Sequence, residues 1–392
     1  MPKTQGKDVS AFLNSVRSTA GSSVQDTIPL ATATNIVDVG LAVIKAPPQI
    51  RNEWMSNIWN KIGLTLQDYP VVSNHLAFLK KGTLEYGQTI EDIYYGLATA
   101  EPYWTGMADE DVEANKYPDP FSVRKIPHRS AFYSAILSRQ YTVTRHLTDI
   151  KKAFQSAAGV DEFLGALLNA VTSREAYDDY RMTVALMARQ IQEVQAIDGY
   201  AGNIHLITDF NTLNPDNTVT AANCFQNKDF LTYFSNIMKK WSNRMKYLRK
   251  DLNIAGVENL LPKDRQRIMM LDDIVTDFET YLLPWAFDNG NLQIGGVDGI
   301  DAWYSIGAAN EEAEAVVVTP EDIEVKATFS TEEGESPCVA VIYDPEMVKI
   351  YNKERIASEQ NNAKGNYWNM FDSVEDIYAQ SPYRNFVCFM LD

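Results

Sequence analysis

Opposite charges are segregated along one stretch of this sequence. Residues 82–115 contain eight carboxylates and no Lys or Arg, whereas residues 116–145 contain six cations and a single acid. Because opposite charges attract, the chemistry predicted here is electrostatic docking, either of the two arms on each other or on a second copy of the chain. The candidate residues for contacts between copies are Glu91, Asp92, Glu101, Asp109, Glu110, Asp111, Glu113, Lys116, Arg124, Lys125 and Arg129.

Both arms have the alternation of β-strands, which predicts a hairpin that carries these charges. One side of the ascending arm presents Ile93, Tyr95 and Leu97, and the descending arm continues to Val143 with apolar residues on both sides. A two-stranded projection is marginally stable in water, so it needs a surface to lie on. The alternative is an edge hairpin whose charged arms stay in solvent, because each exposed ion pair contributes little to stability.

The sequence shows no convincing pattern of catalytic or metal-binding residues. The three cysteines and four histidines are scattered, which argues against a disulfide framework and a local zinc site. The glycines at 295, 296 and 299 lack the strand and helix context of a phosphate-binding loop. Acidic pairs at 178–179 and 272–273 could bind a cation only if the fold brought them together. We therefore predict no enzyme activity, no cofactor and no metal.

Composition indicates a globular protein. The chain has 392 residues, 45% hydrophobic residues and a formal net charge of −17. This charge disfavours attraction of the whole molecule to DNA or to an anionic membrane. Neither a membrane-spanning apolar run nor the layout of a secretory signal is present, so we expect a protein that stays in a cytoplasm.

Apolar periodicity predicts three clear helices around the hairpin. The first covers residues 49–62 and stops at Gly63. The second begins with Asp161 as N-cap and continues to Val194, which makes a long spine across a sheet. The third is a basic amphipathic helix at 228–250, whose cations complement the negative end of the helix dipole. The first fifty residues read as an arm that cannot form a core alone.

Strand signals dominate the last third of the chain. Alternating or continuous apolar runs predict strands at 267–271, 315–318, 323–329, 338–343 and about 383–391, with a further candidate at 367–371. A helix from 273 to about 283 follows the first of these strands. Residues from about 199 to 307 are expected to form an inserted mixed domain, with turn-rich stretches at 214–217 and 295–299.

In this order of elements the chain resembles the major capsid proteins of tailed bacteriophages with the Hong Kong 97 fold, and within that group the head proteins of small short-tailed phages of Gram-positive bacteria. The segments that carry the resemblance are Lys80–Ile93, Tyr141–Phe154, Cys338–Asp344 and Asn361–Phe371. The resemblance implies an α+β Hong Kong 97-like capsid fold with an N-terminal arm, an extended β-hairpin loop, a long spine helix with a peripheral sheet, and an inserted axial domain.

The resemblance also implies a division of the chain and a set of partners. Its segments are an arm at 1–48, a helix and lead-in at 49–80, the extended loop at 81–145, the spine at 146–198, the axial domain at 199–307, and peripheral strands at 308–392. Copies would assemble as pentamers and hexamers into an icosahedral virion head around double-stranded DNA, touching that DNA nonspecifically. A scaffolding protein and a portal are expected partners, with assembly in the host bacterial cytoplasm and no membrane.

Two other classes of protein stay open at this point. A non-viral cytoplasmic shell or scaffold, such as an encapsulin-like compartment, could use the same hairpin to hold a different partner. A metal-dependent hydrolase would require carboxylates that converge from distant positions.

Overall fold

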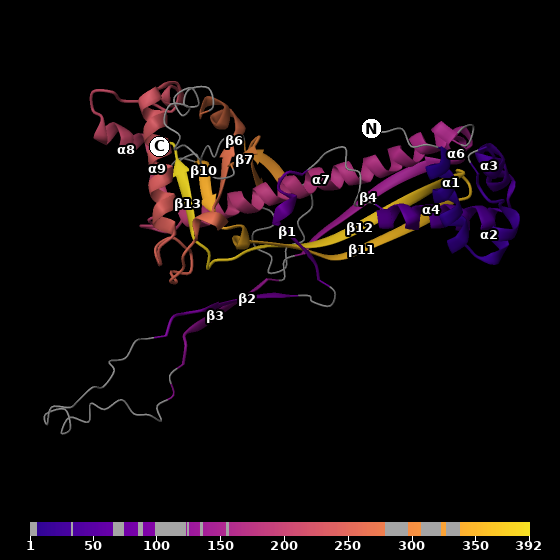
Figure 1. Ribbon diagram of the computed structural model, residues 1–392, viewed down its shortest axis with the longest axis horizontal. Helices are drawn as coiled ribbons and strands as arrows, with labels where there is room; N and C mark the ends of the chain where they lie inside the picture. The colour runs from indigo at the N-terminus through magenta and orange to yellow at the C-terminus, as the bar shows by residue number, and fades with distance from the viewer. Residues whose placement is uncertain are drawn as a thin grey trace.

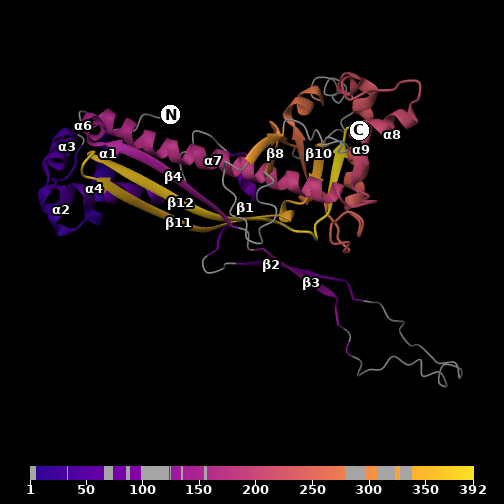
Figure 2. The same cartoon turned by 180° about the vertical axis from the view of Figure 1, so that it is seen from behind.

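The protein is an elongated body built on two sheets that share one long helix, with a two-stranded ribbon projecting from its middle (Figures 1 and 2). We describe it from a computed structural model. The residues that the structure describes are 6–32, 34–65, 74–84, 89–98, 123, 125–133, 136–153, 157–278, 297–306, 323–326 and 338–392.

The first sheet has the strand order β1-β11-β12-β4. Its centre is an antiparallel pair, β11 (Val348–Asn362) and β12 (Tyr367–Gln380). The turn between them places Asn366 at φ 52°, a left-handed conformation that Asn tolerates better than most residues. β4 (Ile136–His146) adds to β12 in antiparallel register, and β1 (Lys80–Thr83) adds to β11 in parallel.

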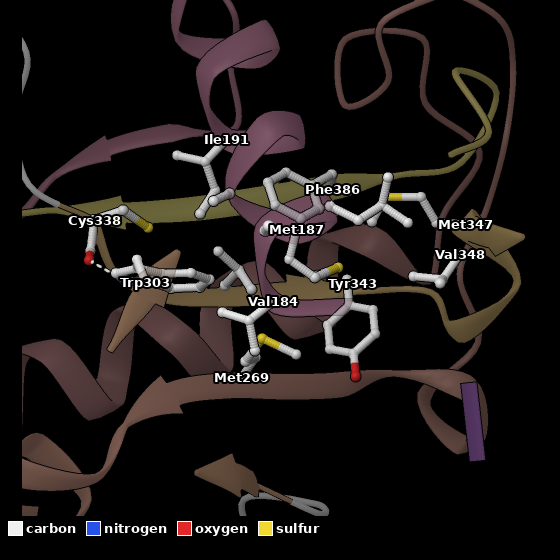
Figure 3. Close-up of a cluster of buried hydrophobic side chains, with 14 of the residues drawn as sticks. Val184, Met187, Ile191, Met269, Trp303, Cys338, Tyr343, Met347, Val348 and Phe386 are labelled. Atoms are coloured by element: carbon white, nitrogen blue, oxygen red, sulfur yellow. Dashed lines mark hydrogen bonds between the residues drawn. The ribbon is translucent and has the colours of Figure 1, made fainter. Parts of the chain in front are cut away.

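The spine helix α7 (Ala157–Gln195) connects the two sheets. Its 39 residues span about 60 Å at 1.5 Å each. Its N-terminal half packs over the first sheet, where Val171 joins a core with Trp368. Its C-terminal half presents Val184 and neighbouring apolar residues to the second sheet (Figure 3). The predicted long helix lying across a sheet is confirmed, and it begins four residues before the predicted N-cap.

The second sheet has the order β5-β13-β10-β6-β7 and lies between helices on both faces. Its strands are β5 (Asn203–His205), β13 (Phe386–Met390), β10 (Cys338–Tyr343), β6 (Arg267–Leu271) and β7 (Val297–Ile300). One face packs against α7, and the other packs against the helices α8 (Leu206–Leu213) and α9 (Lys228–Met245) in a separate core.

A small two-stranded ladder packs against α7 beside the second sheet. It consists of β8 (Trp303–Ile306) and β9 (Ile323–Lys326) in antiparallel pairing. Trp303 is fully buried there, and its indole Nε1 donates a hydrogen bond of 2.9 Å to the carbonyl oxygen of Cys338 (Figure 3). This bond satisfies the one polar group of a large apolar side chain, which permits its complete burial.

The N-terminal residues pack on the body of the same chain. They form α1 (Gly6–Thr19), α2 (Ser22–Thr27) and α3 (Ile36–Lys45), which lead into α4 (Pro48–Thr65). Their buried residues form one core with Trp54 and Ile58 of α4 and with Trp368 and Met370 of β12. We expected an arm without a core of its own. The helices instead borrow apolar surface from α4 and the first sheet, so this segment is folded within the single chain.

Glu359 lies under α4 at the edge of this N-terminal core. Ser56 of α4 donates a hydrogen bond to its carboxylate, while the second carboxylate oxygen, Oε2, is buried without a partner among the described residues. Burial raises the pKa of Glu359 to about 7 from an ordinary value of 4.5. A negative charge on this side chain therefore opposes the docking of α4 on the sheet.

Several predicted boundaries change in the structure. The hairpin ladder contains β2 (Ile90–Tyr95) and β3 (His128–Tyr133), whereas residues 136–145, expected in its descending arm, belong to β4 of the first sheet. The predicted peripheral strand 338–344 lies in the second sheet as β10. The helix α4 continues past Gly63 to Thr65, and α9 ends at Met245 instead of at residue 250.

Most other predicted elements are confirmed. The bounds of β6 and β10 are those predicted, and β13 falls within the predicted terminal strand. The chain is helical at 272–278, so the second helix of the inserted domain begins one residue before the predicted start at 273. The predicted strand at 315–318 and the ends of the predicted strand at 323–329 and of the predicted helix at 273–283 lie outside the described residues. β11 is a long strand that periodicity did not predict, and α6 (Leu147–Ala153) is a short helix between β4 and α7.

Candidate subunit interface

One face of the hairpin is anchored to its own chain, which we call the inner hairpin face: Ile90, Asp92 and Tyr94 of β2 with Arg129, Ala131 and Tyr133 of β3. The Tyr94 hydroxyl donates a hydrogen bond of 2.8 Å to the carbonyl oxygen of Glu258. The Arg129 guanidinium donates one of 2.7 Å to the carbonyl oxygen of Ala255. Both contacts attach the root of the ribbon to the loop that follows α9.

Asp92 makes a second attachment, to the other half of the body. Its carboxylate accepts a hydrogen bond from the Ser381 hydroxyl and lies 3.8 Å from Nζ of Lys349. Beside it, the Lys81 ammonium donates to Glu346 at 2.8 Å, and this hydrogen bond lowers the pKa of Glu346. The charged groups at the root of the hairpin are thus engaged within the chain.

The opposite face of the ribbon makes no such attachment to the described residues. This outer hairpin face is formed by Glu91, Ile93 and Tyr95 of β2 and by His128, Ser130 and Phe132 of β3, which the ladder register places on one side. Its apolar side chains are exposed, with Tyr95 at 67%, Phe132 at 65% and Ile93 at 42%. Leu97 and Ile126, just beyond the ladder, are exposed at 59% and 53%.

An apolar face on a projecting ribbon favours contact with another surface. Monomeric proteins seldom expose contiguous apolar patches, and each large side chain buried on contact contributes about 1.5–3 kcal/mol. The ribbon leads away from the body in both views, so its own chain does not cover this face in the described residues (Figures 1 and 2). The outer hairpin face is therefore the candidate site for a second copy.

The structure describes four of the predicted contact residues. Glu91 and Lys125 are exposed, whereas Asp92 and Arg129 bind the body of their own chain. The remaining candidates lie outside the described residues: Glu101, Asp109, Glu110, Asp111, Glu113, Lys116 and Arg124. Our candidate residues were all charged, and they omitted Ile93, Tyr95 and Phe132. The apolar alternation of the ascending arm was the signal that could have included the first two.

A network of charges is buried between α7 and the first sheet. Arg139 of β4 is 3% exposed and pairs with Asp376 of β12 and, at 2.6 Å, with Asp179 of α7. Lys80 of β1 lies 3.2 Å from Asp179 and 3.5 Å from Asp376. Burial alone would raise the pKa of Asp179, but Arg139 and Lys80 outweigh it, and the pKa is lowered.

A second set of charges continues this network along α7. Arg355 of β11 binds Asp372 of β12 and lies 3.2 Å from Glu175 of α7. Burial raises the pKa of Glu175, and the nearby Arg355 opposes this effect. The charges line a groove of about 540 Å³ between α7 and the strands β1 and β11. Cations and carboxylates are matched there, so the network fixes how α7 sits on the sheet.

Within the part of the chain that is described, no group of three His, Cys, Asp or Glu is arranged to hold a metal ion. The acidic pair at 178–179 is engaged with Tyr141, Arg174, Arg139 and Lys80. None of the described helices is both long and apolar enough to cross a membrane.

Solved structures share this arrangement of elements. A chain in the capsid structure of Staphylococcus phage Andhra superposes with a TM-score of 0.54 over 83% of this chain and 86% of that one, at 12% identity. The fold is thus a mixed helix and sheet fold of the kind found in phage capsids.

Sequence comparison then identifies the family. The model of the family described as Phi29-like phage major capsid protein matches residues 13–390, so the chain belongs to this family. The major capsid protein of Bacillus phage GA-1 is 24% identical over 363 residues, which cover 92% of this chain and 65% of that protein. That of Bacillus phage PZA is 21% identical over 97% of this chain and 72% of that protein. The chain is a structural component of a virion, as the resemblance implied.

Proposed function

We propose that the chain forms its shell with the division of labour of the Hong Kong 97 fold. In this proposal residues 6–45 act as the N-terminal arm, the hairpin β2–β3 as the extended loop, and α7 as the spine. The first sheet is then the peripheral part, and the second sheet with α8 and α9 is the axial part. The order of these elements along the chain and their placement about α7 support this assignment.

The outer hairpin face is the observation that carries the proposal. In each subunit it docks on the body of the next, which buries Ile93, Tyr95 and Phe132. This contact joins two different surfaces, and a heterologous contact of this kind closes into rings. Rings of five and six copies then tile an icosahedral head around double-stranded DNA. Each subunit touches several neighbours, so individually weak contacts add up to a stable shell.

The remaining assignments follow from the same proposal. The net charge of −17 keeps subunits soluble before assembly and limits adhesion to the enclosed DNA. A scaffolding protein and a portal act during assembly in the host cytoplasm. The role of the chain is mechanical, without a catalytic step.

A matched pair of substitutions tests the hairpin contact. Leu97→Ser and Leu213→Ser remove the same apolar group from sites exposed at 59% and 67%, the first beside the hairpin ladder and the second on α8. We expect Leu97→Ser to reduce the yield of particles in electron micrographs and sedimentation profiles, and its combination with Phe132→Ser to abolish them. Leu213→Ser should assemble as the wild type does. Normal particles from the hairpin variant would refute the proposed contact.

A further inference from the structure

The α9 helix and the turn after it carry a cationic surface that the proposed hairpin contact does not use. From Phe230 to Lys250 the sequence has six cations and no acid. Two of these cations are neutralised within the chain, since Arg249 binds Asp251 and Lys250 lies 3.1 Å from Glu258. In contrast, Lys240, Arg244 and Lys246 are exposed and form no ion pair with a described carboxylate.

The three cations lie at the C-terminal end of the helix, with Lys240 and Arg244 on one face and Lys246 just beyond them, and we call this set the α9 patch. Lys240 and Arg244 are four residues apart on the helix, and Lys246 is the residue that caps its C-terminus. The guanidinium of Arg244 lies 4.7 Å from the ring centre of Trp241, and the Lys246 ammonium lies 5.0 Å from that of Tyr247. Tyr247 itself is 61% exposed. Aromatic rings thus support the cations at the surface.

The helix dipole explains only part of this arrangement. Cations in the last turn offset the partial negative charge of the helix end, which accounts for Arg244 and Lys246. Lys240 lies earlier in the helix, and like charges at a spacing of four residues destabilise it. On a chain with a net charge of −17, exposed cations that have no carboxylate partner among the described residues are an attractive site for an anionic partner.

The chain itself contains a matching anionic segment. Residues 101–113 carry five carboxylates and no cation. The root of the hairpin that bears this segment is attached at Ala255 and Glu258, in the loop that follows the α9 patch. The ribbon is thus attached beside the end of α9 and leads away from its own chain (Figure 1). In a ring, the ribbon of each copy would reach the body of the next.

We propose that the α9 patch binds the acidic segment 101–113 of a second copy. This inference rests on the proposed function, because it adds an electrostatic contact to the apolar hairpin contact. The apolar face provides most of the attraction, and the charges select the position of the neighbour. Duplex DNA is the competing anionic partner, and the test distinguishes the two.

Charge reversal on both sides of the contact is the test. The patch variant is Lys240→Glu with Arg244→Glu and Lys246→Glu, and the acidic variant is Asp109→Lys with Glu110→Lys and Asp111→Lys. We expect each variant alone to raise the concentration needed for particle formation about tenfold or more at low salt. The chain that carries all six substitutions should recover assembly, because the pairing is restored with its signs exchanged.

A control variant has the same change in net charge as the patch variant. Lys45→Glu, Lys152→Glu and Lys364→Glu reverse three exposed cations on α3, α6 and the turn after β11. It should assemble like the wild type, and circular dichroism should show all variants folded. Assembly of the patch variant at the wild-type concentration would overturn the inference, as would a failure of the six-substitution chain to recover. If the patch variant formed normal particles that retained less DNA, the result would overturn the inference and show that the patch binds nucleic acid instead. A wild type that forms no particles even when a scaffolding protein is co-expressed would refute the proposed function as well.

Discussion

Glu359 makes the attachment of the N-terminal helices dependent on pH. Its side chain lies between β11 and α4, and burial raises its pKa to about 7 from 4.5. Because the pKa of the folded state is the higher one, the protonated carboxyl stabilises docking at low pH. That contribution is lost as the pH rises through 7. Glu359→Gln removes the charge at every pH and keeps most of the shape.

The size of the effect follows from the change in pKa. A fully enclosed carboxyl with this change would contribute about 3.4 kcal/mol, at 1.36 kcal/mol for each pH unit. The side chain is only partly buried, so we expect about 1–2 kcal/mol after screening by solvent. At pH 8 the variant should hold α4 more tightly than the wild type by this amount. At pH 4, below the ordinary pKa of 4.5 as well as the raised one, the two proteins should differ by less than about 0.5 kcal/mol.

Hydrogen exchange of the α4 amides measures this free energy directly. Local opening of the helix sets the exchange rate, so 1–2 kcal/mol corresponds to roughly 5–30-fold slower exchange in the variant at pH 8. Wild type and variant are compared at the same pH, which cancels the intrinsic pH dependence of exchange. Glu354→Gln, at an exposed position on the same strand, is the control and should change little. Equal exchange in wild type and Glu359→Gln at pH 8 would show the reasoning to be wrong.

Two further substitutions test the interior. Arg139→Ala leaves the buried carboxylates Asp376 and Asp179 with Lys80 as their one remaining described cation, so we expect a loss of about 3–5 kcal/mol in urea unfolding. Lys353→Ala, in the more exposed pair with Glu375, should cost less than about 1 kcal/mol. Equal losses would show that burial does not decide the outcome. Asn227 is the N-cap of α9, and its side chain accepts hydrogen bonds from two backbone amides. Asn227→Ala should lower the free energy of local opening at the first α9 amides by about 1 kcal/mol, as measured by hydrogen exchange. Asn227→Ser should keep most of this free energy, because serine is also a good N-cap. No change on Asn227→Ala would mean that the cap is dispensable.

Elements with apolar faces were predictable from the sequence. The stripe of α9 and the continuous apolar run of β10 face packed cores, so periodicity and burial coincide. In contrast, β11 faces α7 and α4 through charged side chains such as Arg355 and Glu359. Ion pairs that form across elements distant in sequence leave no apolar pattern along the strand, and β11 was therefore missed.

Pairing partners could not be predicted from alternation alone. The strand β4 alternates like an arm of the hairpin, yet its partner is β12, more than 200 residues later. The same limit applies to the candidate contact residues. The sign of a charge shows what attracts it, but Asp92 and Arg129 find their partners in their own chain. Exposure of the apolar residues beside them depends on which face of the ribbon the body covers.

The backbone passes between the two sheets more than once. After β10 in the second sheet, β11 and β12 lie in the first, and β13 returns to the second, while α7 spans both. Tilting one half against the other must bend the long helix or shear these crossings. A force applied to either end is thus transmitted through the whole subunit, because the two halves are not independent bodies joined by a hinge.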